Sequence, residues 1–281
     1  MKFSQRQWIV KPKDALQLES MDDDLKNSLW NLVFLFYLDG NDSVNLEYSL
    51  YKSFFKDIRL HFLKKPIDKI SDYCGYIIED IRKLFFNREW FEIYDFIEYI
   101  SKIKSPTDSS RFRETCNKVL ERELSWYRFI WEELVPITDI NEIEAIENTL
   151  ESANILGLIW VKTHIKTALL MLSDKKSPDY RNSIKESISA VESIGSIISW
   201  KSSDTLWASL DKIKGKLKIH PSLERGFKSI YWYTSDDDGI RHSIIEEPTC
   251  DQEDAIFMLV ASSAFINYLI VKCNKAWISL N

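Results

Sequence analysis

Apolar residues recur at three- and four-residue intervals along most of the chain, the spacing that turns one face of an α-helix toward a core. In the first half, this pattern predicts helices over residues 21–39 and 46–63, from about residue 71, from about residue 88, and from residue 111 to Pro136. The second of these should carry an apolar face formed by Leu50, Phe54, Ile58 and Phe62.

The second half repeats the helical pattern with clearer start signals. Pro178 and Pro221 stand at favoured first-turn positions, and Asp251 with Asp254 resembles a capping box. Gly157 marks a break between two of the helical stretches. The predicted helices cover residues 141–155, 158–172, 179–192, 204–217, 221–230 and 252–275.

Composition supports an all-α fold. The 281 residues include only 7 Gly and 7 Pro, too few for a β-rich fold, and 45% are hydrophobic, enough for sizeable cores. Such a length suits one large or two ordinary domains. Because the helical pattern stops and restarts between residues 136 and 141, we predict a helical amino-terminal domain over 1–138, packed against a helical bundle over 139–281.

Nothing in the sequence predicts a membrane segment. The longest apolar stretch, residues 256–271, contains polar residues and is shorter than the roughly 20 residues of a spanning helix. It is expected to be the central helix of the bundle. The amino terminus has no apolar signal core, and the 4 cysteines lack disulfide or zinc spacing. These features predict a cytoplasmic protein with reduced, mostly buried thiols.

The charge balance limits the classes of ligand. A formal net charge of −6 lacks the basic footprint of a duplex-binding domain, so no DNA partner is expected, and any RNA contact should be local and salt-sensitive. The chain also lacks a P-loop, a dinucleotide fingerprint and a Gly-x-Ser-x-Gly elbow. Helix capping accounts for the acidic run at residues 22–24, so neither a metal nor a cofactor is expected.

The strongest chemical signal is Gly239-Ile240-Arg241-His242, which contains one of only 4 histidines. Histidine can act as acid or base near neutral pH, and the arginine fork suits a phosphate. Arg241 could therefore hold the phosphate of RNA while His242 transfers the proton. In the alternative interpretation, Arg241 bridges the acidic residues at 236–238 or 246–247 and His242 only caps a turn.

Two regions resemble abortive-infection proteins of the AbiJ type. At the amino terminus the matching pieces are residues 3–7 (FSQRQ), 11–12 (KP) and 20–31 (SMDDDLKNSLWN). In the second half they are residues 178–192 (PDYRNSIKESISAVE), 220–221 (HP), 239–242 (GIRH), 253–255 (EDA) and 257–260 (FMLV).

The resemblance implies phage defence and a carboxy-terminal domain similar to the HEPN ribonuclease fold. That fold is a helical bundle that commonly dimerises and cuts RNA without metal, so a homodimer and an RNA substrate are expected. Its signature separates the arginine from the histidine by several residues, whereas Arg241 and His242 are adjacent. Adjacent residues on a helix point about 100° apart, so the two side chains cannot project equally into one cleft.

Four further residues are candidates for the same site. Glu186 and Asn182 lie four residues apart on one predicted helix, and could orient His242 or Arg241 from a neighbouring helix. Lys185 and Lys218 could contact the phosphates of RNA. Alternatively, Glu186 and Lys185 form ordinary pairs on the helix surface, and Lys218 belongs to a solvated face. His164 is interpreted as a packing or surface histidine.

The sequence therefore predicts an abortive-infection effector that acts as a metal-independent endoribonuclease or toxin. Arg241, His242 and Glu186 are its candidate catalytic residues, and Asn182, Lys185 and Lys218 its candidate RNA contacts. The alternative is a non-catalytic helical module that senses or docks a component of the phage or the host.

Overall fold

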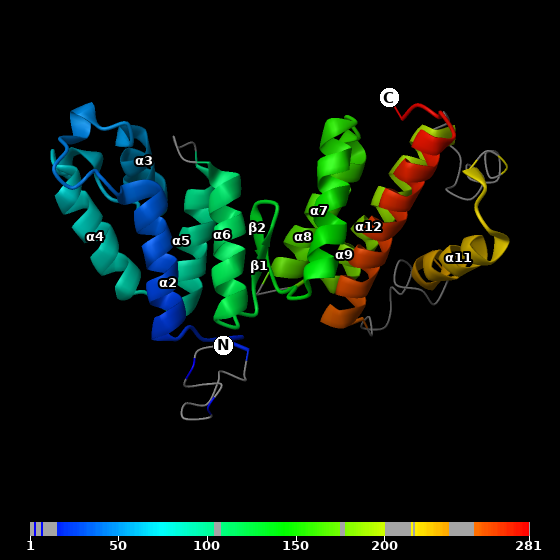
Figure 1. Ribbon diagram of the computed structural model, residues 1–281, viewed down its shortest axis with the longest axis horizontal. Helices are drawn as coiled ribbons and strands as arrows, with labels where there is room; N and C mark the ends of the chain where they lie inside the picture. The colour runs from blue at the N-terminus through cyan, green and yellow to red at the C-terminus, as the bar shows by residue number, and fades with distance from the viewer. Residues whose placement is uncertain are drawn as a thin grey trace. The chain divides into compact units, whose positions relative to one another are not determined.

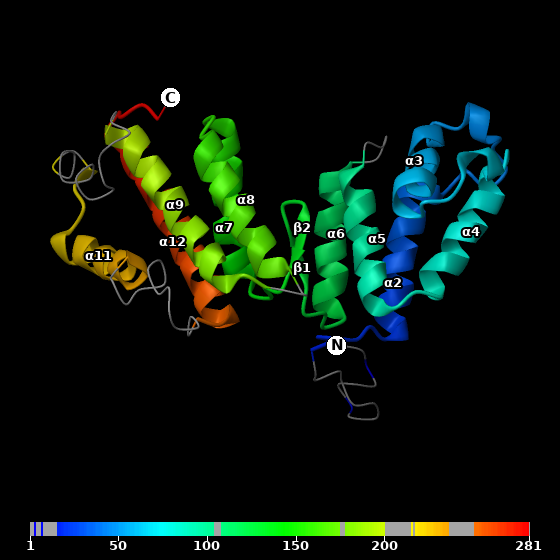
Figure 2. The same cartoon turned by 180° about the vertical axis from the view of Figure 1, so that it is seen from behind.

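The computed structural model describes residues 3, 7, 16–103, 108–174, 178–199, 215, 217–235 and 250–280. The chain divides into two compact units, Met1–Leu134 and Val135–Asn281, and each is described by itself (Figures 1 and 2). Helices dominate both units, which confirms the all-α prediction.

The first unit is a layer of helices that differ in length and regularity. It contains α2 (Asp23–Val33), α3 (Lys52–Asp57), α4 (Cys74–Phe86), α5 (Trp90–Lys102) and α6 (Ser109–Arg122). Two of them continue directly as wider π-helical turns, α2 into η1 (Phe34–Leu38) and α3 into η3 (Ile58–Phe62).

Aromatic rings form much of the core of this unit. The rings of Tyr37 and Phe54 stack with their centroids 4.9 Å apart, and Phe112 of α6 meets Tyr37 edge-on at 5.0 Å. All three side chains are buried. The aromatic residues at helical spacing in this half are therefore mainly packing residues.

The predicted helix at residues 46–63 is wrong in its first part. The chain forms the short 3₁₀-helix η2 (Leu46–Tyr48) and an extended residue, Ser49, before α3 begins. The side chain of Asn45 accepts a hydrogen bond from the Glu47 amide, so local side-chain bonding competes with the helix. As a result, Leu50 is 82% exposed instead of facing the core.

The helix predicted from residue 111 to Pro136 also ends early. Helix α6 stops at Arg122, and Leu124 has a left-handed backbone with φ of 56°. A small hairpin of β1 (Arg128–Ile130) and β2 (Glu133–Val135) follows. The Ser125 hydroxyl, fully buried, lies 2.7 Å from the Tyr94 hydroxyl, so tertiary contacts hold this segment outside the helix.

The second unit is a helical bundle. Its helices are α7 (Ile140–Ile155), α8 (Ile159–Ser173), α9 (Tyr180–Ser199), α11 (Pro221–Ser235) and α12 (Gln252–Lys275). These confirm the predicted helices, including the break at Gly157 (φ 68°) and the capping box of Asp251 and Asp254. The helix predicted at 204–217 lies outside the described residues, apart from positions 215 and 217.

Helix α12 packs between its neighbours through apolar and polar contacts. It is long and apolar enough to cross a membrane, as the core helix of a bundle can be, and half of its most apolar stretch is buried. The Thr149 hydroxyl of α7 lies 3.0 Å from the Asn267 Oδ1, and Asn267 donates to the Ala145 carbonyl. These partly buried bonds give the Asn267 side chain its partners and tie α12 to α7.

The thiols give a direct test of this packing. Cys74, Cys116 and Cys273 are fully buried, and burial raises the pKa of Cys273 to about 11. Cys250 is partly exposed. Because reaction needs an accessible thiolate, Ellman's reagent at pH 8 should modify Cys250 first and the other three only in denaturant.

A Cys250→Ser variant is the matched control and should lack the fast phase. Rapid reaction of two or more thiols in the native protein would contradict the packing described above.

Candidate functional site

The candidate residues fall in different parts of the second unit. Arg241 and His242 lie outside the described residues. Asn182, Lys185 and Glu186 lie on the first two turns of α9, and Lys218 lies shortly before α11. The site can therefore be built from α9 and the elements that contact it.

Helix α9 begins with a cap that uses one of the candidates. The Asp179 carboxylate accepts hydrogen bonds from the Asn182 amide N–H, at 3.0 Å, and from the Asn182 side-chain Nδ2, at 2.7 Å. A carboxylate here satisfies amide groups that have no partner within the helix. Asn182 thus has a structural role at the start of α9.

Glu186 has a histidine partner that sequence analysis did not identify. Its Oε2 lies 2.6 Å from Nδ1 of His164 on α8, with both side chains about three-quarters buried. The antiparallel packing of α8 and α9 sets this pairing. The same register lets Ser183 donate to the Ala168 carbonyl at 2.9 Å. Glu186 is therefore bound across helices, instead of pairing with a lysine on its own helix.

The contact with Glu186 fixes the chemistry of the His164 ring. When the carboxylate accepts the Nδ1 proton, Nε2 of the neutral ring carries the lone pair and can accept a proton. Within the part of the chain that the structure describes, Nε2 has no hydrogen-bond partner. The pair thus has the geometry of a general acid–base group with an orienting carboxylate.

An exposed aromatic ring lies beside this pair. Trp160 is one helical turn before His164, is 66% exposed, and has its ring centroid 6.4 Å from that of the imidazole. Exposed aromatic faces stack on unpaired bases of single-stranded RNA. Trp160, His164 and Glu186 therefore place a stacking surface next to a group that can transfer protons.

The structure separates the two candidate lysines. Lys185 is exposed and directly precedes Glu186 on α9. The Lys218 carbonyl instead accepts a hydrogen bond from Lys272, near the end of α12. Helices α9 and α12 begin at the same end of the bundle (Figure 2). Burial raises the pKa of Tyr180 at the start of α9, and the charges of Glu253 and Asp251 at the start of α12 raise it further.

Lys218 and the capped end of α9 are thus at opposite ends of α12, a span of about 30 Å for 20 helical residues. The structure does not bring Lys218 to the His164–Glu186 pair.

Arg241 and His242 belong to residues 236–249, and the described residues on both sides of this segment lie near the start of α9. On one flank, burial and the charge of Asp254 raise the pKa of Tyr233, with a smaller effect from Cys250. On the other flank, burial raises the pKa of Cys250, and the nearby charge of Arg181 partly offsets this increase. Both flanks are therefore at the end of the bundle where Asn182 and Lys185 lie.

A metal site is not formed by the described residues. Within these ranges, no three His, Cys, Asp or Glu side chains come together as a metal ion would require. The groups that the described site offers are the His164 imidazole, the Glu186 carboxylate and the Trp160 ring.

His164 is the residue that sequence analysis interpreted as packing or surface. The signal available was its spacing from Trp160, four positions away on the same predicted helix. The partner carboxylate on the next helix could be identified only once the register of α8 against α9 was known.

Fold and site together define a two-unit helical protein with a histidine–glutamate pair on its second unit. The family AbiJ N-terminal domain 4 matches residues 1–152, more than half of the chain, and the protein belongs to this family. An AbiJ amino-terminal domain suggests a role in abortive-infection phage defence. No curated protein and no solved structure shows significant similarity to the chain.

The family match covers the first unit and continues into α7 of the second. It thus ends beyond both the predicted boundary at residue 138 and the division of the structure after Leu134. The domain limits given by the sequence stay a prediction, and so does the likeness of residues 139–281 to the HEPN fold.

Proposed function

We propose that this protein is an abortive-infection effector whose second unit cuts RNA without a metal ion. The observation that supports the proposal is the 2.6 Å contact between Glu186 and His164, next to the exposed ring of Trp160. This arrangement provides a proton-transfer group and a base-stacking surface in one place.

Cleavage would proceed by internal attack of the RNA on its own phosphodiester. A base takes the proton of the 2′-hydroxyl, the 2′-oxygen bonds to phosphorus, and the bond from phosphorus to the 5′-oxygen breaks. An acid then protonates the 5′-oxygen, giving a 2′,3′-cyclic phosphate and a free 5′-hydroxyl. No oxidant or co-reactant is needed.

His164 would serve as one of the two proton-transfer groups, with Glu186 fixing its ring. Arg241 would bind the phosphate and His242 would supply the second proton-transfer group, as the sequence predicts for these two residues. A cytoplasmic homodimer, with one such set per protomer, is part of this proposal. A component of the phage or the host would be the trigger.

The alternative function is a non-catalytic module that docks or senses another molecule. It is favoured by the small size of the cavities among the described residues. The cavity between α9, α11 and α12, lined by Val191, Phe227 and Phe265, has a volume of about 20 Å³. Such a cavity admits about one water molecule, so a larger molecule at this place would bind to the surface of the three helices.

Induction in cells separates the two functions. The wild type, Arg241→Ala/His242→Ala and His164→Ala should be compared for growth and for total RNA, with RNA ends mapped chemically. We expect growth arrest and new 2′,3′-cyclic phosphate ends in the wild type, and neither in the two variants. Purified wild type should give the same ends in the presence of EDTA.

His61→Ala is a matched control, because His61 is exposed and lies 3.7 Å from a carboxylate, that of Asp57, in the first unit. It should behave as the wild type. Intact RNA in cells that are nonetheless protected from phage would favour the docking module. RNA decay that persists in all variants would overturn the proposed site.

A further inference from the structure

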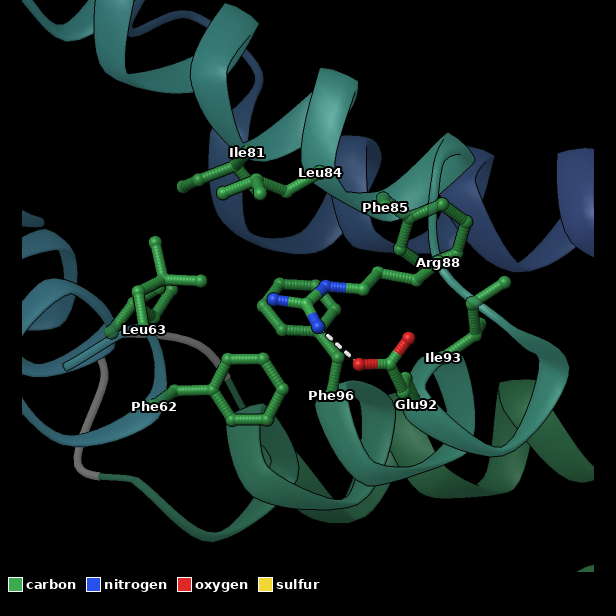
Figure 3. A pocket seen from close by; sticks show the side chains of 10 residues that line it. Phe62, Leu63, Ile81, Leu84, Phe85, Arg88, Glu92, Ile93 and Phe96 are labelled. Atoms are coloured by element: carbon green, nitrogen blue, oxygen red, sulfur yellow. Dashed lines mark hydrogen bonds and ion pairs between the residues drawn. The ribbon is translucent and has the colours of Figure 1, made fainter. Parts of the chain in front are cut away.

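The first unit contains an apolar surface pocket that the proposed function does not use. It lies between α4, η3 and α5, and Figure 3 shows the side chains that surround it. Its apolar wall consists of Ile58, Phe62, Leu63, Ile81, Leu84, Phe85, Ile93 and Phe96. A second, more polar pocket shares Ile58, Leu63 and Ile81 with the first and lies next to it.

The π-helical turn η3 builds the wall shared by the two pockets. The Leu63 amide donates to the Ile58 carbonyl at 2.8 Å, five residues back, so Ile58, Phe62 and Leu63 all face the pocket. Turns of this kind occur often at functional sites. The next residue, Lys64, has a left-handed backbone with φ of 50°, a conformation that costs energy for a lysine.

One charged pair lies at the edge of the apolar pocket. Figure 3 shows the Arg88 side chain extending over the pocket, with its guanidinium bound to the Glu92 carboxylate. Exposed ion pairs contribute little to stability, and 42% of the Arg88 side chain is exposed. An acidic group from outside could therefore take the place of Glu92 at little cost.

The backbone below Arg88 is fixed even though its side chain can exchange partners. The Lys26 ammonium donates to the carbonyls of Phe86 and Arg88, at 3.0 and 3.2 Å. The turn between α4 and α5 is thereby tied to α2. The guanidinium is thus presented from a rigid support, which favours specific recognition.

Basic residues outnumber acidic ones around the two pockets. Arg59, Lys65 and Arg88 line them, against the two acids Asp80 and Glu92. This local charge contrasts with the net charge of −6 of the whole chain. It favours a partner that carries acidic groups next to an apolar group.

We infer that this pocket docks a segment of another protein in which an aromatic or branched apolar side chain is flanked by acidic residues. The apolar side chain would occupy the space over Leu63 and Ile81. The carboxylate of an acidic neighbour would accept two hydrogen bonds from the Arg88 guanidinium. Tyr76, which is 70% exposed one turn before Asp80 on α4, extends the contact surface.

A protein segment fits better than RNA, because Leu, Ile and Phe side chains form the wall and the free volume is small. The cavity volume of the apolar pocket is about 20 Å³, so a side chain enters only as Arg88 moves from over the pocket to bind the acidic neighbour. A nucleobase would instead need an open, flat slot and a stacking face.

Binding can be measured on the full-length protein with fluorescein-labelled hexapeptides and anisotropy. The probe is EDFLDE, with EDSSDE lacking the apolar anchor and KRFLRK carrying the opposite charge. We expect EDFLDE to bind at least about tenfold more tightly than either control peptide. Arg88→Glu and Leu63→Ser should each weaken EDFLDE by about tenfold or more.

Arg122→Glu is the matched control, because this arginine is also exposed and ion-paired, with Glu123, but lies on α6. It should bind EDFLDE as the wild type does, and circular dichroism should show all variants folded. Equal binding of EDSSDE, no effect of Arg88→Glu, or no binding of EDFLDE at about 1 mM would each overturn the inference. Binding of a single-stranded RNA that Arg88→Glu abolishes would overturn it in favour of RNA.

Discussion

Replacing His164 with alanine should lower the rate of RNA cleavage by the purified protein by about 10²–10⁴-fold, the range for a lost acid–base group. The loss should appear in kcat, because the imidazole transfers a proton in the transition state and contributes little to binding the RNA. The measurement is cleavage of a labelled single-stranded RNA under single-turnover conditions.

Glu186→Gln should give a rate between those of the wild type and His164→Ala. The glutamine side chain can still accept from Nδ1 through its amide oxygen, but it carries no charge to stabilise the imidazolium. A lower rate at an unchanged melting temperature would separate this effect from that of a merely structural contact.

His61→Ala again serves as the control and should cleave at the wild-type rate. The melting temperatures of all variants need to be compared, because Glu186 and His164 also join α8 to α9. A folded His164→Ala protein that cleaves at the wild-type rate would remove His164 from the reaction while leaving Arg241 and His242 open to test.

Much of the fold follows from local signals in the sequence. Few Gly and Pro residues and helical spacing gave the all-α class, and the caps at Asp139 and Asp251 lie where the sequence predicts helix starts. These signals succeed because capping and amphipathic spacing act within one or two turns. Long-range contacts have little influence on them.

The failures lie where distant contacts override the local pattern. Residues 123–135 keep helical spacing, yet Ser125 is bound to Tyr94 and the buried Arg128 guanidinium donates to the Ser125 carbonyl at 2.7 Å. A buried arginine needs such partners, which a continuous helix would not supply. The sequence alone does not reveal that these residues meet α5.

The candidate site divides in the same way. Glu186 was identified from its helix and a family resemblance, but its partner depends on how two antiparallel helices align. Only the alignment of α8 with α9, with Ser183 bound to Ala168, places His164 opposite Glu186. Lys218 was grouped with Glu186 because its ammonium could contact the phosphates of RNA, whereas the bundle places it far from the His164–Glu186 pair.

Two glycine-to-alanine substitutions should change stability in opposite directions. Gly75 lies in the first turn of α4, where an added Cβ would be 2.5 Å from the backbone carbonyl oxygen of Asp42. The crossing segment cannot move away easily, because the Leu46 amide donates to the Asp72 carbonyl and the Cys74 amide to the Val44 carbonyl. Gly75→Ala should therefore cost about 1–3 kcal/mol through overpacking.

Gly226 offers the same substitution without the clash. It is exposed on α11, and an added Cβ would meet no heavy atom within 4 Å. Alanine here should stabilise the protein by about 0.5–1 kcal/mol, because it restricts the unfolded chain and favours the helix. Urea denaturation of the full-length protein, followed by circular dichroism, measures both changes.

The pair separates helix propensity from packing, because propensity alone would stabilise the protein at both positions. Equal stabilisation by the two substitutions would mean that the backbone at Asp42 moves away from α4 to make room for the added methyl group. The close contact between Gly75 and Asp42 would then not be required for stability. Opposite signs would instead show that a glycine is required where this segment crosses the start of α4, the helix whose far end forms the wall of the Arg88 pocket.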